Sequence, residues 1–137
     1  AYFGEKDFQQ IAVIKSMVAQ LALPIEIVEC AISRGEDGLA LSSRNTLLDA
    51  AHRAAAPHIY ATLHAAVSKS QEMTPAQLKA WVTAEVERNP LLKVIYYQSV
   101  DARTMQEVAT WDDSPRIQGC IAVQAGDIRL IDNICIR

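Results

Sequence analysis

Cysteine is scarce in this 137-residue sequence, which has three of them, at Cys30, Cys120 and Cys135. An odd number of cysteines with no Cys-x-x-C spacing argues against a disulfide framework and against a zinc site. Unpaired thiols are typical of a reducing compartment, so we expect a cytoplasmic protein. We also expect the three side chains to lie inside strands as small apolar groups.

An excess of positive charge is missing as well. Thirteen Lys and Arg residues stand against sixteen Asp and Glu residues, which gives a formal net charge of −3 and a pI near 5.6. Proteins that bind nucleic acids generally carry a basic excess, so this balance disfavours a nucleic-acid partner. No apolar run approaches the ~18 residues that a membrane span needs, so we expect no membrane helix.

Apolar residues, by contrast, make up 50% of the chain, which excludes wholesale disorder and is typical of a folded domain. Residues 7–21 carry apolar side chains at steps of three and four, which predicts a helix with Asp7 as its N-cap. Residues 1–3 before it, and residues 25–32 after Pro24, have the patterns of buried strands. The order strand, helix, strand is one unit of a parallel α/β sheet.

One such unit cannot form a complete sheet alone. We therefore expect residues 1–45 to be the C-terminal remnant of an α/β domain that begins before Ala1. Residues 34–44 are polar and contain Gly35 and Gly38, which predicts a loop at the end of this part.

Residues 46–137 have the pattern of a small α+β domain. Pro57 divides a helical stripe over residues 49–68, and Thr74 with Gln77 forms a capping box that starts another helix. Strand patterns follow at residues 92–100, 117–124 and 128–136. We expect three antiparallel strands with the helices on one face, the last two strands being joined as a hairpin.

Two segments carry the residue types of an anion-binding site. In Phe3-Gly4-Glu5-Lys6-Asp7-Phe8-Gln9-Gln10, a glycine follows a strand and a helix begins directly after it. Lys6 supplies a positive charge for a phosphate, Asp7 can accept from ribose hydroxyls, and Gln10 lies one turn further along the helix. On spacing alone, a capped helix with solvated charges explains this segment as well.

The second segment is Asp37-Gly38-Leu39-Ala40-Leu41-Ser42-Ser43-Arg44-Asn45. Ser42 and Ser43 can donate to phosphate oxygens, and Arg44 can reach two such oxygens at once. Alone, this is also the composition of an ordinary polar loop. Each segment nevertheless follows one of the two predicted parallel strands, and ligands bind at that edge of open α/β sheets.

Other residues give weaker signals. His52, His58 and His64 are six residues apart, a step of about 240° on a helix, so they share no face and indicate no metal site. We expect Tyr60 and Trp81 to be core residues rather than stacking platforms.

Two polar pairs in the last third of the chain have structural explanations. Asp112-Asp113 could be a metal pair, but the neighbouring residues favour a turn with solvated charges. Asp132-Asn133 interrupts the last strand pattern and favours a buried structural hydrogen bond.

The two segments, together with Arg129-Leu130-Ile131-Asp132-Asn133, resemble the pantoate–β-alanine ligase family, also called pantothenate synthetases. The three blocks occur in the family's order and approximate spacing, so the resemblance covers essentially the whole chain. It implies a Rossmann-like nucleotidyltransferase domain followed by a smaller domain that covers the site. It also implies a ligase that condenses pantoate with β-alanine through a pantoyl adenylate. Such a ligase acts in the biosynthesis of pantothenate and hence in the coenzyme A pathway. In this reaction ATP is consumed, Mg²⁺ is required, and AMP and pyrophosphate are released.

The resemblance also implies roles for individual residues. The implied ATP-binding residues are Gly4, Glu5, Lys6, Asp7, Ser33, Leu41, Ser42, Ser43 and Arg44. Lys6, Ser42 and Arg44 would stabilise the phosphates and the transition state, without a covalent nucleophile. Ser33 falls where a main-chain group meets the adenine, residues 41–44 match a mobile loop of the family, and Gln10 matches a pantoate-binding glutamine.

Several residues of the family pattern are absent. The sequence lacks the paired histidines, the second pantoate-binding glutamine and the acidic residues that bring in Mg²⁺. We therefore expect this chain to be the C-terminal half of the enzyme, inactive alone, with the Mg²⁺ ligands in the other half. Uncovered sheet edges and an exposed apolar face predict a homodimer, with or without swapped elements, or else a poorly ordered segment before Arg34. An alternative of another class is a noncatalytic nucleotide-binding or assembly module that needs a separate partner chain.

Overall fold

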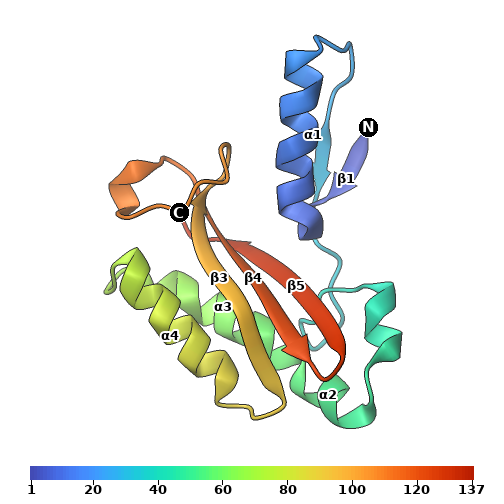
Figure 1. Ribbon diagram of the computed structural model, residues 1–137, viewed down its shortest axis with the longest axis vertical. Coiled ribbons are helices and arrows are strands. Elements are labelled where there is room, and N and C mark those ends of the chain that lie inside the picture. Colours follow the sequence, from blue (N-terminus) through green and yellow to red (C-terminus); the bar gives the residue numbers. More distant parts are fainter.

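The computed structural model describes residues 1–137, and its first 30 residues form a strand–helix–strand unit (Figure 1). Strand β1 (Tyr2–Gly4) leads through a 3₁₀ turn, η1 (Glu5–Asp7), into helix α1 (Phe8–Gln20), and β2 (Val28–Cys30) follows. β1 and β2 are parallel, with Tyr2 opposite Val28. The predicted parallel unit is therefore confirmed.

Two details of this unit differ from the sequence prediction. The second strand covers only Val28–Cys30, not residues 25–32, because its partner β1 has three residues and the ladder ends with it. Asp7 precedes α1 but makes no capping hydrogen bond through its side chain. A capping residue normally has an extended backbone, whereas Asp7 ends the turn η1 at φ −93° and ψ 54°.

A loop connects this unit to the rest of the chain, as predicted. Arg34 and Ala40 form an isolated antiparallel bridge, and the 3₁₀ turn η2 (Ser43–Leu47) follows. Gly38 has a φ of +86°, and a Cβ there would lie 2.5 Å from Cδ2 of Tyr60. Only glycine fits this position, which allows the loop to pass directly over the Tyr60 ring.

Three helices come next: α2 (Ala50–Ala55), α3 (Pro57–Lys69) and α4 (Pro75–Glu87). Pro57 separates the first two, as predicted. Thr74 and Gln77 form the predicted capping box, in which the Gln77 amide donates to Thr74 Oγ1 at 3.2 Å and the Thr74 amide donates to Gln77 Oε1 at 3.0 Å.

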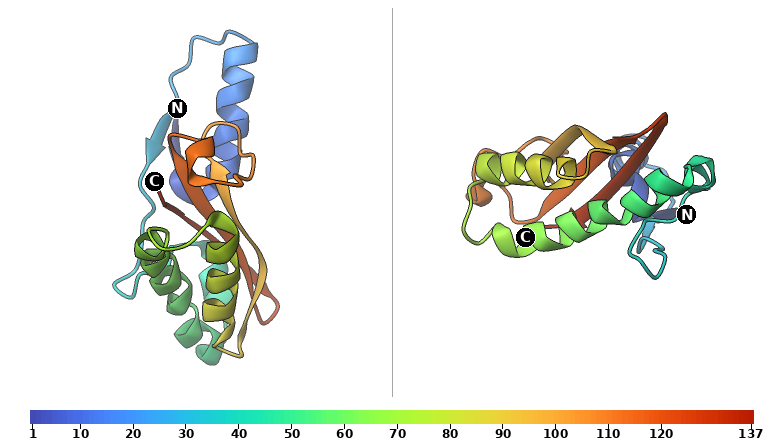
Figure 2. Two further views of the ribbon diagram at one scale, coloured as in Figure 1. Left: turned by 90° about the vertical axis from the view of Figure 1, so that its left-hand side faces the viewer. Right: turned by 90° about the horizontal axis from the view of Figure 1, so that it is seen from below.

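The remaining residues form the predicted antiparallel sheet of β3 (Leu92–Asp101), β4 (Ile117–Ala125) and β5 (Ile128–Cys135), in the order β3-β4-β5. α3 and α4 pack on one side of this sheet (Figure 2). The core between the helices and the sheet contains residues with no solvent exposure from α3, α4 and β4, including Leu63, Leu78, Val82, Ile117 and Val123. This arrangement confirms the predicted α+β class of the second part of the chain.

The other face of the sheet meets the start of α1. Phe8 is 5% exposed and packs with Val100 of β3 and Cys120 of β4. Phe8 therefore anchors the start of α1 on the sheet, while the rest of α1 extends beyond the sheet (Figure 1). None of the helices is long and apolar enough to span a bilayer.

The prediction for the cysteines was wrong at two of three positions. Cys120, in the central strand, is buried, whereas Cys30 and Cys135 are exposed. Both exposed residues are the last of a strand that lies at the edge of its sheet, where one side has no neighbouring strand.

Candidate active site

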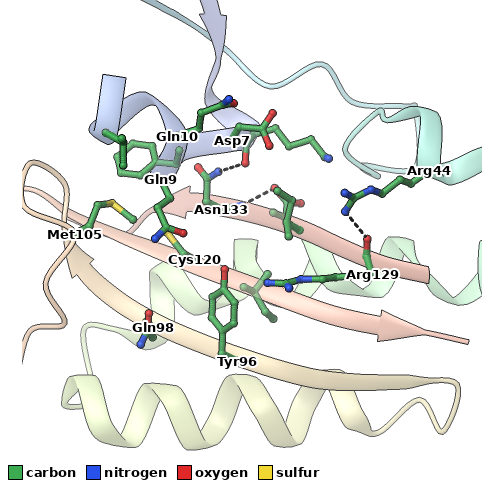
Figure 3. A pocket seen from close by; sticks show the side chains of 16 residues that line it. Asp7, Gln9, Gln10, Arg44, Tyr96, Gln98, Met105, Cys120, Arg129 and Asn133 are labelled. Atoms are coloured by element: carbon green, nitrogen blue, oxygen red, sulfur yellow. Dashed lines mark hydrogen bonds between the residues drawn. The ribbon is translucent and has the colours of Figure 1, made fainter. Parts of the chain in front are cut away.

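A cleft of about 790 Å³ separates the start of α1 from the open face of the three-stranded sheet (Figure 3). Three parts of the chain contribute its lining. The polar side chains around it are Lys6, Asp7, Gln9, Gln10, Arg44, Tyr96, Gln98, Arg129, Asp132 and Asn133. A concave site with convergent polar groups at the junction of two structural parts is the usual form of a ligand-binding site.

A second hollow of about 390 Å³ lies at the carboxyl ends of β1 and β2. It is lined by Gly4, Lys6, Asp7, Cys30, Ala31, Ile32, Ser33, Leu41 and Ser42. Because Lys6 and Asp7 also line the cleft, the two spaces adjoin at these residues. Carboxyl ends of parallel strands are where open α/β sheets bind ligands.

The structure brings most of the predicted site residues together. Those around the second hollow are Gly4, Lys6, Asp7, Ser33, Leu41 and Ser42. Arg44 and Gln10 lie in the larger cleft with Lys6 and Asp7. The two sequence segments, about 35 residues apart in the chain, therefore line one continuous concave surface.

Glu5 and Ser43 line neither space. The Glu5 carbonyl accepts a hydrogen bond of 2.7 Å from Asn133 Nδ2, and the Ser43 carbonyl accepts one of 2.8 Å from Thr46 Oγ1. Their main chains thus hold the turns η1 and η2 in place, which puts Lys6 and Arg44 at the cleft.

Two hydrogen bonds of Arg44 itself fix its position on the turn η2. Ser42 Oγ accepts from the Arg44 amide at 3.1 Å, which caps η2 and leaves the Ser42 hydroxyl proton free to donate. Arg44 Nη1 donates to the Arg129 carbonyl at 3.3 Å, so the loop reaches across to β5 (Figure 3).

Asp132, also on β5, anchors the connecting loop through Arg34. Arg34 Nη1 and Nη2 donate to the two carboxylate oxygens of Asp132 at 2.7 and 2.9 Å, and Asp132 is 5% exposed. The Arg34 guanidinium also lies 3.8 Å above the Tyr60 ring. The expectation that Tyr60 is only a core residue was wrong, because Gly38 lets the loop place Arg34 on the ring face.

Asn133 holds the turn η1. Its Oδ1 accepts from Gln118 Nε2 at 2.8 Å, and its Nδ2 donates to the carbonyls of Glu5 and Lys6 at 2.7 and 3.2 Å. The predicted buried structural hydrogen bonds of Asp132-Asn133 are confirmed. Sequence reasoning missed their partners, although two polar residues inside an apolar strand pattern signalled that partners existed.

The charges in the cleft are mostly positive. Lys6, Arg44 and Arg129 make no ion pair with any carboxylate, and the Asp132 carboxylate is already paired with Arg34. Asp7 is the other acidic residue of the lining. Burial raises the pKa of the Cys120 thiol in the cleft to about 12, so this thiol stays protonated at neutral pH and is no nucleophile.

The histidines have local partners. His52 Nδ1 contacts the Asp49 carboxylate at 2.8 Å, and His58 Nε2 contacts the Glu85 carbonyl at 2.7 Å. His64 lies edge-on to Tyr60. No group of three or more His, Cys, Asp or Glu side chains in the chain is placed to hold a metal ion.

Comparison with known proteins shows the family to which the chain belongs. The family model described as pantoate-beta-alanine ligase matches residues 1–135. The chain belongs to the pantoate–β-alanine ligase family. The pantothenate synthetase of Porphyromonas gingivalis is 50% identical over 134 residues, which cover 98% of this chain and 48% of that protein. The pantothenate synthetase of Bacteroides thetaiotaomicron is 47% identical with the same coverage. The chain thus spans about half the length of these relatives.

Solved structures of the pantoate–β-alanine ligase family share the fold. Pantothenate synthetase from Thermus thermophilus matches with a TM-score of 0.90 at 35% identity, over 99% of this chain and 49% of that chain. The ligase from Francisella tularensis, complexed with beta-gamma ATP and beta-alanine, matches with a TM-score of 0.68 at 26% identity, over 98% and 42% of the two chains. The predicted fold class, an α/β remnant followed by a small α+β part, is confirmed.

Proposed function

We propose that this chain is the C-terminal part of an ATP-dependent ligase that condenses pantoate and β-alanine into pantothenate. The observation that carries the proposal is the position of Lys6 and Asp7, which line both the hollow at the strand ends and the cationic cleft. A nucleotide can then bind with its nucleoside in one space and its phosphates in the other. The Francisella relative, described with ATP and β-alanine, supports this choice of ligands.

The proposed chemistry has two steps. The pantoate carboxylate attacks the α-phosphorus of ATP, the bond to the β-phosphate oxygen breaks, and pantoyl adenylate and pyrophosphate form. The amine of β-alanine then attacks the acyl carbon of the adenylate, loses a proton and displaces AMP. No covalent bond to the protein is needed, so this chain acts by positioning and by electrostatic stabilisation.

We propose the following roles for the residues around the two spaces. Gly4 and the main chain at Ser33 and Leu41 line the adenosine end, and Asp7 accepts from the ribose hydroxyls. Lys6 and Arg44, with the hydroxyl of Ser42, meet the phosphates, and Glu5 and Ser43, which line neither space, act through their main chains. Gln10, in the cleft, binds pantoate through its amide.

Negative charge builds up on the α-phosphate and on the departing pyrophosphate, so fixed cations stabilise the transition state more than the ground state. Removing one such group typically slows a reaction by 10²–10³-fold, or about 3 kcal/mol. In the cleft, Lys6 and Arg44 are free for this work because neither is engaged by a carboxylate.

Mg²⁺ belongs to this proposal as the ion that neutralises the nucleotide phosphates. In this chain, no cluster of three or more His, Cys, Asp or Glu side chains is placed to hold a metal ion. We propose that its ligands lie outside this chain, together with the missing pantoate contacts, and that the chain alone is inactive. Residues 1–45 would then complete a nucleotide-binding domain, and residues 46–137 would form the domain that covers it.

The test is complementation. This chain is mixed with the N-terminal half of the Porphyromonas gingivalis relative, and conversion of ATP to AMP that depends on pantoate and β-alanine is measured. We expect no turnover from either part alone and turnover from the mixture, reduced at least 100-fold by Lys6→Ala or Arg44→Ala. Lys93 is exposed on β3 and serves as the matched control, so Lys93→Ala should leave the turnover of the mixture unchanged.

Two outcomes would contradict the proposal. Near-normal turnover by Lys6→Ala or Arg44→Ala would reject the phosphate roles. Pantoate-independent ATP binding without turnover in any mixture would favour the alternative, a noncatalytic nucleotide-binding or assembly module.

We also propose that the chain forms a homodimer. Large apolar side chains on α1 and after it are exposed, among them Val13 at 63%, Leu21 at 62% and Ile25 at 47%. Covering them would remove apolar area from water. Sedimentation velocity at micromolar concentration should give a dimer, and a stable monomer would reject this part of the proposal.

A further inference from the structure

We propose that Arg129 is a third phosphate-binding residue of the cleft and contacts the pyrophosphate end of ATP. This inference rests on the proposed function. Arg129 begins the block Arg129–Asn133, in which Asp132 and Asn133 have structural partners but the arginine side chain has no partner of opposite charge.

The position of Arg129 follows from strand geometry. It is the second residue of β5 and pairs with Gln124 of β4. Its neighbour Leu130 is 6% exposed and belongs to the core under the sheet, so Arg129 faces the opposite side. Arg129 lines the cleft, and Figure 3 shows its side chain lying across the sheet face toward Tyr96.

The aromatic ring keeps this side chain over the cleft floor. The Arg129 guanidinium carbon lies 5.9 Å from the centre of the Tyr96 ring, within the range of a cation–π contact. Such a contact orients the guanidinium without neutralising it. The planar fork of Arg129 therefore stays available for two phosphate oxygens.

Arg44, another cation of the cleft, contacts the main chain of Arg129. Arg44 Nη1 donates to the Arg129 carbonyl at 3.3 Å, so these two residues are in direct contact. Lys6, Arg44 and Arg129, none of them paired with a carboxylate, give the lining of this one cleft an excess of positive charge that an anion can neutralise. By contrast, Arg34 on the other side of β5 has its own carboxylate, Asp132. A polyanion such as pyrophosphate supplies the missing negative charge.

The experiment uses this chain and two probes, inorganic pyrophosphate and adenosine, titrated by calorimetry. We expect Arg129→Gln to weaken pyrophosphate binding about tenfold or more, as loss of a charge-assisted hydrogen bond would, and to leave adenosine binding unchanged. Arg129→Lys keeps the charge but not the fork, so it should recover part of the affinity. Arg103→Gln, an exposed arginine between β3 and β4 outside the cleft, is the control.

The results separate this inference from the proposed function. If Lys6→Ala and Arg44→Ala weaken pyrophosphate binding but Arg129→Gln does not, Arg129 only packs on Tyr96 and the inference is wrong. If the unmodified chain binds neither probe, the inference and the nucleotide roles proposed above both fail. A lower salt dependence of pyrophosphate binding in Arg129→Gln, with an unchanged melting temperature, would support the direct contact.

Discussion

At the scale of single residues, neighbours on one strand serve opposite sides of the molecule. Asp132 binds Arg34 of the connecting loop through two hydrogen bonds, and Asn133 binds the main chain of the turn that carries Lys6. β5 therefore fixes the loop and the turn relative to the sheet. The sequence marked these two polar residues as structural, but partners about a hundred residues away could not be read from a local pattern.

We expect Asp132→Asn to lower the free energy of unfolding by about 3 kcal/mol, because it leaves the Arg34 guanidinium buried without its carboxylate. Arg34 has only 18% of its side chain exposed, so water cannot replace the lost partner fully. Urea unfolding measures the change. Asp112→Asn, an exposed carboxylate in a short turn, is the matched control and should stay within about 0.5 kcal/mol of the unmodified chain. Equal losses in the two variants would show that the ion pair stabilises nothing.

At the scale of elements, local sequence patterns correctly predicted the features that contacts between nearby residues determine. The capping box at Thr74 and the break at Pro57 set helix ends through contacts within a few residues, and both were predicted. The length of β2 depends on β1, which lies 24 residues away in the chain, so its pattern over residues 25–32 was misleading. The stacking of Arg34 on Tyr60 likewise depends on a loop path that only the fold defines.

The short 3₁₀ turn η3 (Trp111–Asp113) contains local hydrogen bonds whose contribution to stability depends on pH. The amides of Thr110 and Ala109, with the Thr110 hydroxyl, hold the pKa of Asp113 below its usual value of 3.8. A carboxyl whose pKa is lower in the folded state stabilises the protein above its unfolded pKa. That stabilisation is lost as the pH falls below 3.8 toward the folded value.

Between pH 6 and pH 3, the melting temperature of the Asp113→Asn variant should therefore fall less than that of Asp112→Asn. Asp112 is the neighbouring residue and lacks these hydrogen bonds. Thermal unfolding followed by circular dichroism at the two pH values measures the difference. Identical acid sensitivity of the two variants would contradict the role of Asp113 as the acceptor of the turn's amides.

At the scale of the whole molecule, two segments far apart in sequence line two adjoining spaces, one at the strand ends of the first unit and one between that unit and the three-stranded sheet. The sequence predicted that they share one sheet edge, and the smaller hollow lies at that edge, whereas the larger cleft lies between α1 and the other sheet. It did not predict the contribution of the sheet itself, because Tyr96, Gln98 and Arg129 sit in ordinary strand patterns. Strand alternation sets the face on which they lie, but that this face borders a cleft depends on how the first unit docks on the sheet.

One claim supports the rest: residues 4–7 and residues 41–44 bind the same nucleotide. Titration of the isotope-labelled chain with ATP, followed by amide chemical shifts, tests it directly. We predict that both sets of amides shift with a single dissociation constant, and that Lys6→Ala weakens the shifts of both sets in parallel. Shifts confined to one set, or two sets that titrate with different constants, would contradict the account.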